Sequence, residues 1–254
     1  MHRFNRQPDQ ELPVHNRHNI TVCWTGEQYR ITDGEDDDFE LSAIYTVENL
    51  YKRMHRRALA NLPDHVGVRA VTGVLGNRAF LIVGGKGSGK SILAVRMMLE
   101  GYQITGDELA LLHDGEVVPF PRRFMLPGDG IALVPELQGF DEFADFMATD
   151  RTRLIPIDPQ SLGKPWRIAP LAVSTILAVE RNFGSRSAAW PCGKLDMSRR
   201  MLPQCNRTSA GGELIRELSR TIDTARTFVL SLGDLNSAIA VIKNVLPIHI
   251  PYSQ

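Results

Sequence analysis

Apolar residues recur along the chain in two patterns. Runs rich in β-branched and aromatic residues predict strands at residues 20–24, 29–31, 66–74, 78–83, 102–105, 109–112, 116–120, 154–157, 174–179 and 227–230. Apolar positions at helical spacing predict helices at residues 46–62, 92–99, 213–222 and 236–245. Strands and helices alternate over most of the chain, which predicts an α/β fold with a mixed sheet flanked by helices and a small N-terminal α+β extension.

The same patterns predict the domain organisation. Residues 1–17 are polar and are expected to form a flexible tail, residues 18–65 carry N-terminal strands and a helix, and residues 66–254 form the main domain. The acidic residues at 33–38 are expected to form a solvated loop, with a cation site as the alternative.

The helix predicted at residues 46–62 has an apolar stripe and a basic side. Thr46 is its expected N-cap, and Val47, Leu50 and Met54 recur at helical spacing. The basic residues fall mostly away from this stripe and are interpreted as its solvated side, with substrate docking as the alternative: Lys52, Arg53, Arg56 and Arg57.

Composition narrows the class of partner. Lys and Arg together number 29, as do Asp and Glu, so the net charge is zero and neither nucleic acid nor membrane is expected as a partner. The 3 cysteines are widely spaced and lack a C-x-x-C pair, which favours reduced thiols over a disulfide framework or a zinc site. The N-terminus lacks the apolar segment of a signal peptide, and no apolar run approaches membrane-spanning length. We therefore expect a cytoplasmic protein.

The strand at residues 79–83 leads directly into G-x-x-x-x-G-K-S, and a helix follows. This setting predicts a phosphate-binding loop, because glycines let backbone N–H groups converge on phosphate oxygens at a helix N-terminus. Lys90 would neutralise the β- and γ-phosphates of ATP, and the Ser91 hydroxyl would bind Mg²⁺. The predicted nucleotide-binding residues are Gly84, Gly85, Lys86, Gly87, Ser88, Gly89, Lys90, Ser91 and Ile92.

An acid follows the next strand. Asp107 comes after one helix and one short strand, and that strand is expected to neighbour the strand that leads into the loop. Asp107 would therefore reach the Mg²⁺ and γ-phosphate region, as a metal ligand or as a base for an attacking hydroxyl. The alternative is a capping or turn aspartate. Glu108 is a weaker candidate, since neighbours on a strand point to opposite faces.

Further along the chain, Arg122 and Arg123 follow a predicted hairpin. Guanidinium groups match phosphate oxygens, so the pair either clamps a transferring phosphate or lies on the surface. Residues 128–150 are interpreted as an excursion that covers the site or contacts a substrate.

Several stretches resemble the kinase domain of the HPr kinase/phosphorylase family, and more closely the short HPr-kinase-related kinases that include lasso-peptide tailoring kinases. The resemblance is carried by residues 68–71, 78–91, 106–112, 117–122 and 228–235. It implies a P-loop kinase domain of the HPr kinase and phosphoenolpyruvate carboxykinase type at residues 66–254, which transfers the ATP γ-phosphoryl group to a serine hydroxyl. Asp107 matches the family's catalytic base.

The chain departs from this family in two places. Arg69 stands where the family usually has a histidine, and arginine cannot relay a proton at neutral pH. Arg69 would instead pair with Asp107 or contact phosphate, which makes it a third catalytic candidate beside Asp107 and Lys90. The C-terminal signature of the bifunctional enzymes is not found, so phosphorolysis is not predicted.

The implied partner is a serine-bearing peptide or protein, including the precursor of a peptide natural product. Because the related bifunctional enzymes are hexameric, the resemblance also implies a homo-oligomer. Two other functions stay open. A phosphate loop followed by an early acid also suits a small-molecule kinase. Arg69 in place of the family's histidine suits a non-catalytic ATP-binding regulatory protein that has lost turnover.

Overall fold

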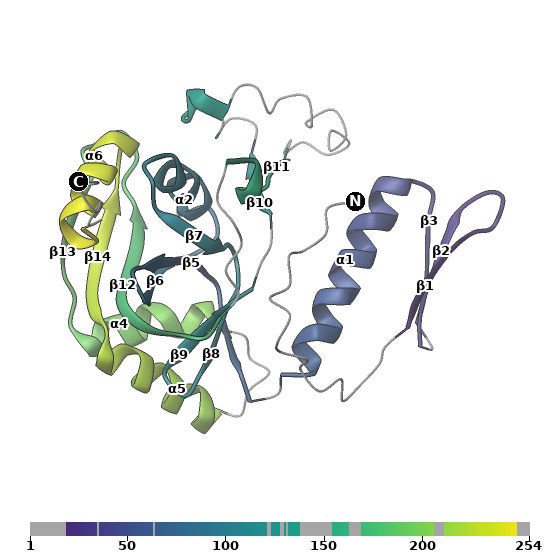
Figure 1. Ribbon diagram of the computed structural model, residues 1–254, viewed down its shortest axis with the longest axis horizontal. Helices are drawn as coiled ribbons and strands as arrows, with labels where there is room; N and C mark the ends of the chain where they lie inside the picture. Colours follow the sequence, from purple (N-terminus) through teal and green to yellow (C-terminus); the bar gives the residue numbers. More distant parts are fainter. Residues whose placement is uncertain are drawn as a thin grey trace, which may run out of the picture. The chain divides into compact units, whose positions relative to one another are not determined.

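The computed structural model describes residues 19–34, 36–62, 64–120, 123–127, 130, 132–137, 154–162, 169–205 and 211–247 (Figure 1). The chain divides into two compact units, Met1–Pro63 and Asp64–Gln254. The predicted tail at residues 1–17 lies outside the described residues, and the assignment of 18–65 and 66–254 as functional domains stays a prediction. None of the described helices has both the length and the apolarity needed to cross a membrane.

The first unit is a three-stranded antiparallel sheet and a helix. Its strands lie in the order β1-β2-β3. The elements are β1 (Ile20–Trp24), β2 (Tyr29–Asp33), β3 (Asp36–Glu40) and α1 (Ala43–Ala60). The solvated loop expected at residues 33–38 is wrong, because most of these acids belong to β2 and β3. Thr46 is not the N-cap either, because α1 begins earlier and the Thr46 hydroxyl donates to the Ser42 carbonyl at 2.9 Å.

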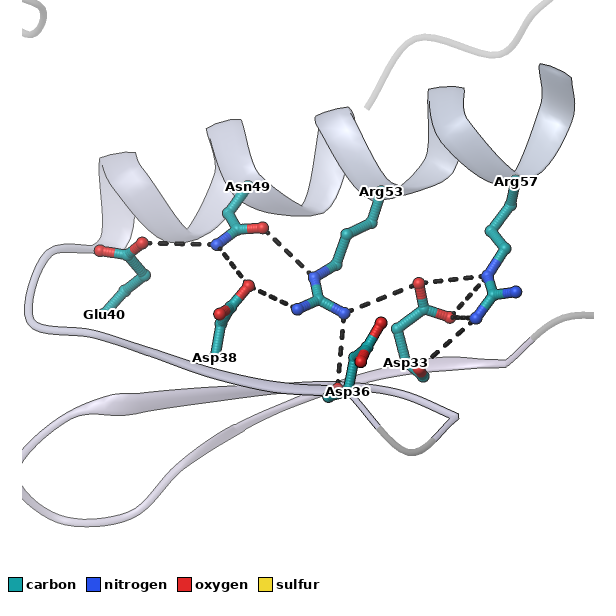
Figure 2. Close-up of polar contacts among 7 residues, drawn as sticks. All are labelled: Asp33, Asp36, Asp38, Glu40, Asn49, Arg53 and Arg57. Carbon is teal, nitrogen blue, oxygen red and sulfur yellow. Dashed lines mark hydrogen bonds and ion pairs between the residues drawn. The ribbon is translucent and has the colours of Figure 1, made fainter. Parts of the chain in front are cut away.

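The helix α1 turns its basic side toward the sheet. Arg53 is only 4% exposed, and Figure 2 shows its guanidinium among the carboxylates of Asp33 and Asp38 and the Asp36 carbonyl. Arg57 pairs with Asp33 at 2.8 Å. The interpretation of Arg53 as part of a solvated side is therefore wrong. The strands β2 and β3 supply acidic partners for the arginines, of which Asp33 is buried, whereas residues predicted to form the apolar stripe are more exposed, with Val47 at 62% and Met54 at 52%.

The second unit is built on a nine-stranded mixed sheet. Its strands run in the order β4-β8-β9-β12-β6-β5-β7, with β14 beside β12 and β13 beside β14. β12 is parallel to both β6 and β14, and the other pairings are antiparallel. The strands are β4 (Val66–Val68), β5 (Ala70–Leu75), β6 (Arg78–Val83), β7 (Gln103–Gly106), β8 (Ala110–His113), β9 (Glu116–Pro119), β12 (Leu171–Arg181), β13 (Ala188–Pro191) and β14 (Arg226–Leu232).

Helices cover both faces of this sheet (Figure 1). Along β6, alternate side chains point to opposite faces: Phe80 and Ile82 join the core formed with α2 and α6, and Leu81 joins the core formed with α4 and α5. The helices are α2 (Lys90–Leu99), α4 (Lys194–Met201), α5 (Gly211–Thr224) and α6 (Leu235–Val245). The predicted class, an α/β fold with a mixed sheet flanked by helices, is confirmed.

Smaller elements complete the described part. β10 (Phe124–Pro127) and β11 (Leu154–Ile157) form a separate antiparallel pair, and β10 contacts α2. The short 3₁₀ helices of the described part include η2 (Pro159–Leu162) and η3 (Leu202–Gln204).

Candidate functional site

Three predicted site residues lie at one edge of the sheet, and the strand register explains why. Ala70, the first residue of β5, pairs with Val83, the last residue of β6. Further along β5, Thr72 pairs with Gly106, the last residue of β7. The residues just outside these strands, Arg69, Gly84 and Asp107, therefore leave the sheet at the same edge.

The expected direct pairing of the two strands is wrong. β7, which precedes Asp107, pairs with β5 rather than with β6, because the β5–β6 hairpin places β5 between them. β5 is antiparallel to both neighbours, so β7 runs in the same direction as β6. Asp107 therefore lies at the same end of the strands as the start of the glycine-rich loop. Its strand, β7, is the second neighbour of β6 in the sheet, whereas the sequence predicts that it is the first.

The glycine-rich loop, residues 84–89, is shaped by positive backbone angles. Gly87 has φ 77° and Gly89 has φ 93°, a region that side chains other than glycine rarely adopt. The Ser88 N–H donates to the Gly85 carbonyl at 3.3 Å, which closes the turn. The first turn of α2 follows immediately, and helix geometry leaves its first N–H groups without intrahelical partners. The loop and this helix end together offer the backbone donors that an anion needs.

Lys90 is held against the loop. Its side chain is 8% exposed, and Nζ donates to the carbonyls of Gly84 at 2.7 Å and Gly85 at 3.0 Å. Burial lowers the pKa of Lys90, the nearby Asp107 carboxylate opposes this shift, and the Arg69 charge adds to it. The ammonium group therefore lies within electrostatic reach of both other catalytic candidates.

Asp107 and Ser91 lie close together. The Asp107 carboxyl group is buried, with 6% of the residue exposed, and the Ser91 hydroxyl is near enough to act on its pKa as a donor. Burial raises the pKa of Asp107, while the Ser91 hydroxyl and the Lys90 charge act in the opposite direction. The raised pKa makes this carboxylate a stronger base than an exposed aspartate.

The same two residues suit Mg²⁺. This hard cation prefers oxygen ligands and is usually held by one or two protein groups, with water and substrate phosphates completing the octahedron. The Ser91 hydroxyl and Asp107 carboxylate are such oxygens, and they are adjacent. The described residues contain no cluster of three or more His, Cys, Asp or Glu side chains that would make a self-sufficient metal site.

Glu108 has an unusual backbone that the sequence did not indicate. Its φ is 79°, which is uncommon for a residue with a side chain and belongs to strained turns. Glu108 is exposed, and its charge acts on both Lys90 and Asp107. The tight turn between β7 and β8, which contains Glu108, thus lies at the candidate site.

The basic candidates differ in their placement. Arg69 is exposed, its N–H donates to the Gln204 carbonyl at 2.7 Å, and its charge reaches Lys90. Within the described ranges no ion pair joins Arg69 to Asp107. Arg123 is likewise exposed, and its Nε lies 3.4 Å from Asp158 Oδ2. Arg122 and most of residues 128–150 lie outside the described residues.

Other predicted and unpredicted residues surround the loop. The Ile92 side chain packs against the core beside Gly130, so only its backbone is suited to contact a ligand. Leu232 and Phe183 lie against Gly89 from the β12 and β14 side. The sequence did not single out either residue, because their proximity to the loop depends on strand pairing far along the chain.

The comparisons with known proteins add little beyond this geometry. No protein-family model matches the chain, and no curated protein matches it. The chain is similar to the solved structure of the HPr(Ser) kinase/phosphatase from Coxiella burnetii, with 15% identity over 46% of this chain and 60% of that chain and a TM-score of 0.27. The chain thus spans less than two thirds of that structure, and neither fold nor function follows from so low a score.

Proposed function

We propose that the second unit is an ATP- and Mg²⁺-dependent kinase that transfers the γ-phosphoryl group to the serine hydroxyl of a peptide or protein. The observation that carries the proposal is the proximity of Ser91, at the start of α2, to the buried Asp107 carboxyl group. A glycine-rich loop alone suits any nucleotide-binding protein. A buried acid beside Ser91, the serine that ends the G-x-x-x-x-G-K-S motif, suits phosphoryl transfer, because one group then lies near both the metal and the attacking oxygen.

Each residue of the site has its own role in the proposed reaction. Backbone N–H groups of residues 84–92 bind the phosphates, and Lys90 offsets the negative charge at the β- and γ-phosphates. Mg²⁺, held by Ser91 and Asp107, would neutralise charge on the phosphate oxygens. Asp107 takes the proton from the acceptor hydroxyl, whose oxygen bonds to the γ-phosphorus as the bond to ADP breaks.

Arg69 is assigned to phosphate in this proposal. Its charge lies near Lys90, which supports a contact with the γ-phosphate over a pairing with Asp107. An exposed guanidinium at the edge is also free to approach an incoming acceptor. The identity of the acceptor as a peptide serine rests on the resemblance of the loop and Asp107 region to HPr-kinase-related kinases.

The test of this function uses full-length protein, Mg²⁺ and γ-labelled ATP. Label transfer is measured to a panel of serine-containing peptides and to a panel of hydroxyl-bearing metabolites, with mass spectrometry of the products. We expect transfer to a peptide serine and its loss in Lys90→Ala, together with ATP binding weakened about 10- to 100-fold through the lost charged contacts.

Lys194→Ala is the matched control. Lys194 is an exposed lysine on α4 that pairs with Asp223, so its removal is expected to leave both measurements unchanged. Transfer only to metabolites would support the small-molecule kinase. ATP binding without transfer to either panel would support the non-catalytic ATP-binding protein and contradict the proposal.

A further inference from the structure

An exposed aromatic side chain lies directly beside the glycine-rich loop. Phe183 is 48% exposed, so its ring is open to solvent. A Cβ added to Gly89 would lie 3.5 Å from Phe183 Cζ, so the tip of the ring borders the last glycine of the loop. Gly89 immediately precedes Lys90 and Ser91. A planar group held on this ring would therefore adjoin the proposed phosphate site.

The turn that carries Phe183 is well anchored. The Asn182 N–H donates to the Leu232 carbonyl at 2.8 Å, and the Ser185 hydroxyl donates to the Asn182 carbonyl at 2.8 Å. The Asp234 N–H in turn donates to the Ser185 carbonyl at 3.0 Å. These bonds join the turn to the end of β14 and the start of α6. The ring is thus presented from a fixed backbone, which lowers the entropic cost of using it as a binding surface.

Arg181 covers one side of the ring. Its Cζ lies 4.3 Å from the Phe183 ring centroid, the geometry of a cation–π contact. The guanidinium plane is itself a stacking surface, and Arg181 is exposed. An aromatic ring and an arginine that stack on each other at the surface form a platform of the kind that binds nucleobases, because every base has a π-face.

The platform lies on the side of the loop away from the proposed base. Across the sheet the order is β12-β6-β5-β7, so Phe183 follows the strand on one side of β6 and Asp107 follows β7 on the other (Figure 1). A nucleoside triphosphate carries its base on one side of the ribose and its phosphate chain on the other, with the γ-phosphate at the far end of that chain. With the γ-phosphate toward Asp107 and the phosphates on residues 84–91, the base extends toward Phe183.

We propose that Phe183 and Arg181 form the subsite for the nucleobase of the nucleotide, with the base stacked on this aromatic–guanidinium pair. The proposal rests on the proposed function, because it needs a nucleotide on the loop. It predicts that Phe183 contributes to the binding of ligands that carry a base and not to the binding of polyphosphate alone.

The test compares a ligand with a base and a ligand without one. Binding of ATP and of inorganic tripolyphosphate, each with Mg²⁺, is measured by calorimetry on full-length wild type, Phe183→Ala and Phe183→Trp. We expect Phe183→Ala to weaken ATP binding about 10-fold, the scale of one base–aromatic stack, and to leave tripolyphosphate binding unchanged. Phe183→Trp should retain ATP affinity. Trp190→Ala, which removes another exposed aromatic on the outer strand β13, should change neither affinity.

Each other outcome has a defined meaning. Equal losses for both ligands would show that Phe183 supports the loop instead of binding a base, and an unchanged ATP affinity would place the base elsewhere; both overturn the subsite. Wild type that binds tripolyphosphate with the same affinity as ATP overturns the subsite and leaves the phosphate site standing. Wild type that binds neither ligand contradicts the proposed function, and the subsite fails with it.

Discussion

Ser91, in the first turn of α2, lies close to the buried carboxyl group of Asp107, which follows β7. Most of α2 and the strand β7 separate the two residues along the chain, and in the sheet β5 lies between β6, which precedes the loop, and β7. Their proximity is therefore a product of tertiary folding and not of local sequence. Substitutions at Asp107 therefore test a site that exists only in the folded protein, because strand pairing and not the local turn brings Asp107 close to Ser91.

Replacing Asp107 with asparagine is expected to remove the proposed base while keeping the size of the side chain. Phosphoryl transfer should fall about 100- to 10,000-fold, the usual contribution of a general base, and ATP binding should change far less. Label transfer and calorimetry on the same preparations provide the two measurements. Asp223→Asn, an exposed aspartate on α5, is the control. Transfer that persists at the wild-type rate in Asp107→Asn would exclude Asp107 as the base.

The same substitution should affect stability in a pH-dependent way. Burial raises the pKa of Asp107 above its ordinary 3.8, so the folded protein keeps this proton at pH values where the unfolded chain has lost it. Stability therefore falls as pH rises from about 3.8 through the folded-state pKa, and the cost is fully present above it.

Asparagine carries no such cost. At neutral pH we expect Asp107→Asn to unfold at a higher temperature than wild type, and the difference to shrink as pH falls toward 4. Thermal unfolding monitored by circular dichroism across this pH range measures it. A wild type that gains stability relative to Asp107→Asn as pH rises would contradict the raised pKa.

Two loop glycines offer a contrast between folding and binding. A Cβ at Gly89 would lie 2.7 Å from Leu232 Cδ2, and its φ of 93° disfavours any side chain, so Gly89→Ala should cost about 2 kcal/mol of stability. A Cβ at Gly85 would meet nothing within 4 Å. Gly85→Ala should therefore unfold like wild type yet bind ATP more weakly, because the methyl group hinders the approach of phosphate.

Chemical denaturation and ATP calorimetry on both variants check this contrast. A Gly85→Ala protein that is as unstable as Gly89→Ala would show that Gly85 serves the fold. A stable Gly85→Ala protein with wild-type ATP affinity would count against residues 84–89 as the phosphate site.

Features encoded by neighbouring residues were predictable from the sequence. A strand, a glycine-rich turn and a helix are consecutive at residues 78–99, and each carries its own local signal, so the arrangement of β6, the loop and α2 is as expected. The same holds for the β8–β9 hairpin. Such signals depend on side-chain periodicity and turn chemistry over short distances.

Features that depend on distant partners were not predictable. The insertion of β5 between β6 and β7 is a choice of strand pairing, and nothing in the short stretch before Asp107 specifies it. The position of Phe183 beside Gly89 likewise follows from the pairing of β12 with β6. Periodicity does not specify which side of α1 faces the sheet, because it distinguishes two faces of a helix but does not show the acidic strands that bind one of them.

The buried position of Arg53 leads to a prediction for the first unit. Replacing Arg53 with methionine keeps most of the apolar length of the side chain and removes one cation from Asp33, which is 3% exposed and keeps its ion pair with Arg57 (Figure 2). Breaking a buried ion pair commonly costs about 3–5 kcal/mol, and the retained Arg57 contact places the expected loss at the lower end of this range. Amide hydrogen exchange on the full-length protein should then accelerate in β1–β3 and α1 and stay unchanged in the second unit. Arg56→Met, at an exposed position of the same helix, is the matched control. Equal exchange in the two variants would mean that the buried arginine contributes no more to this unit than an exposed one.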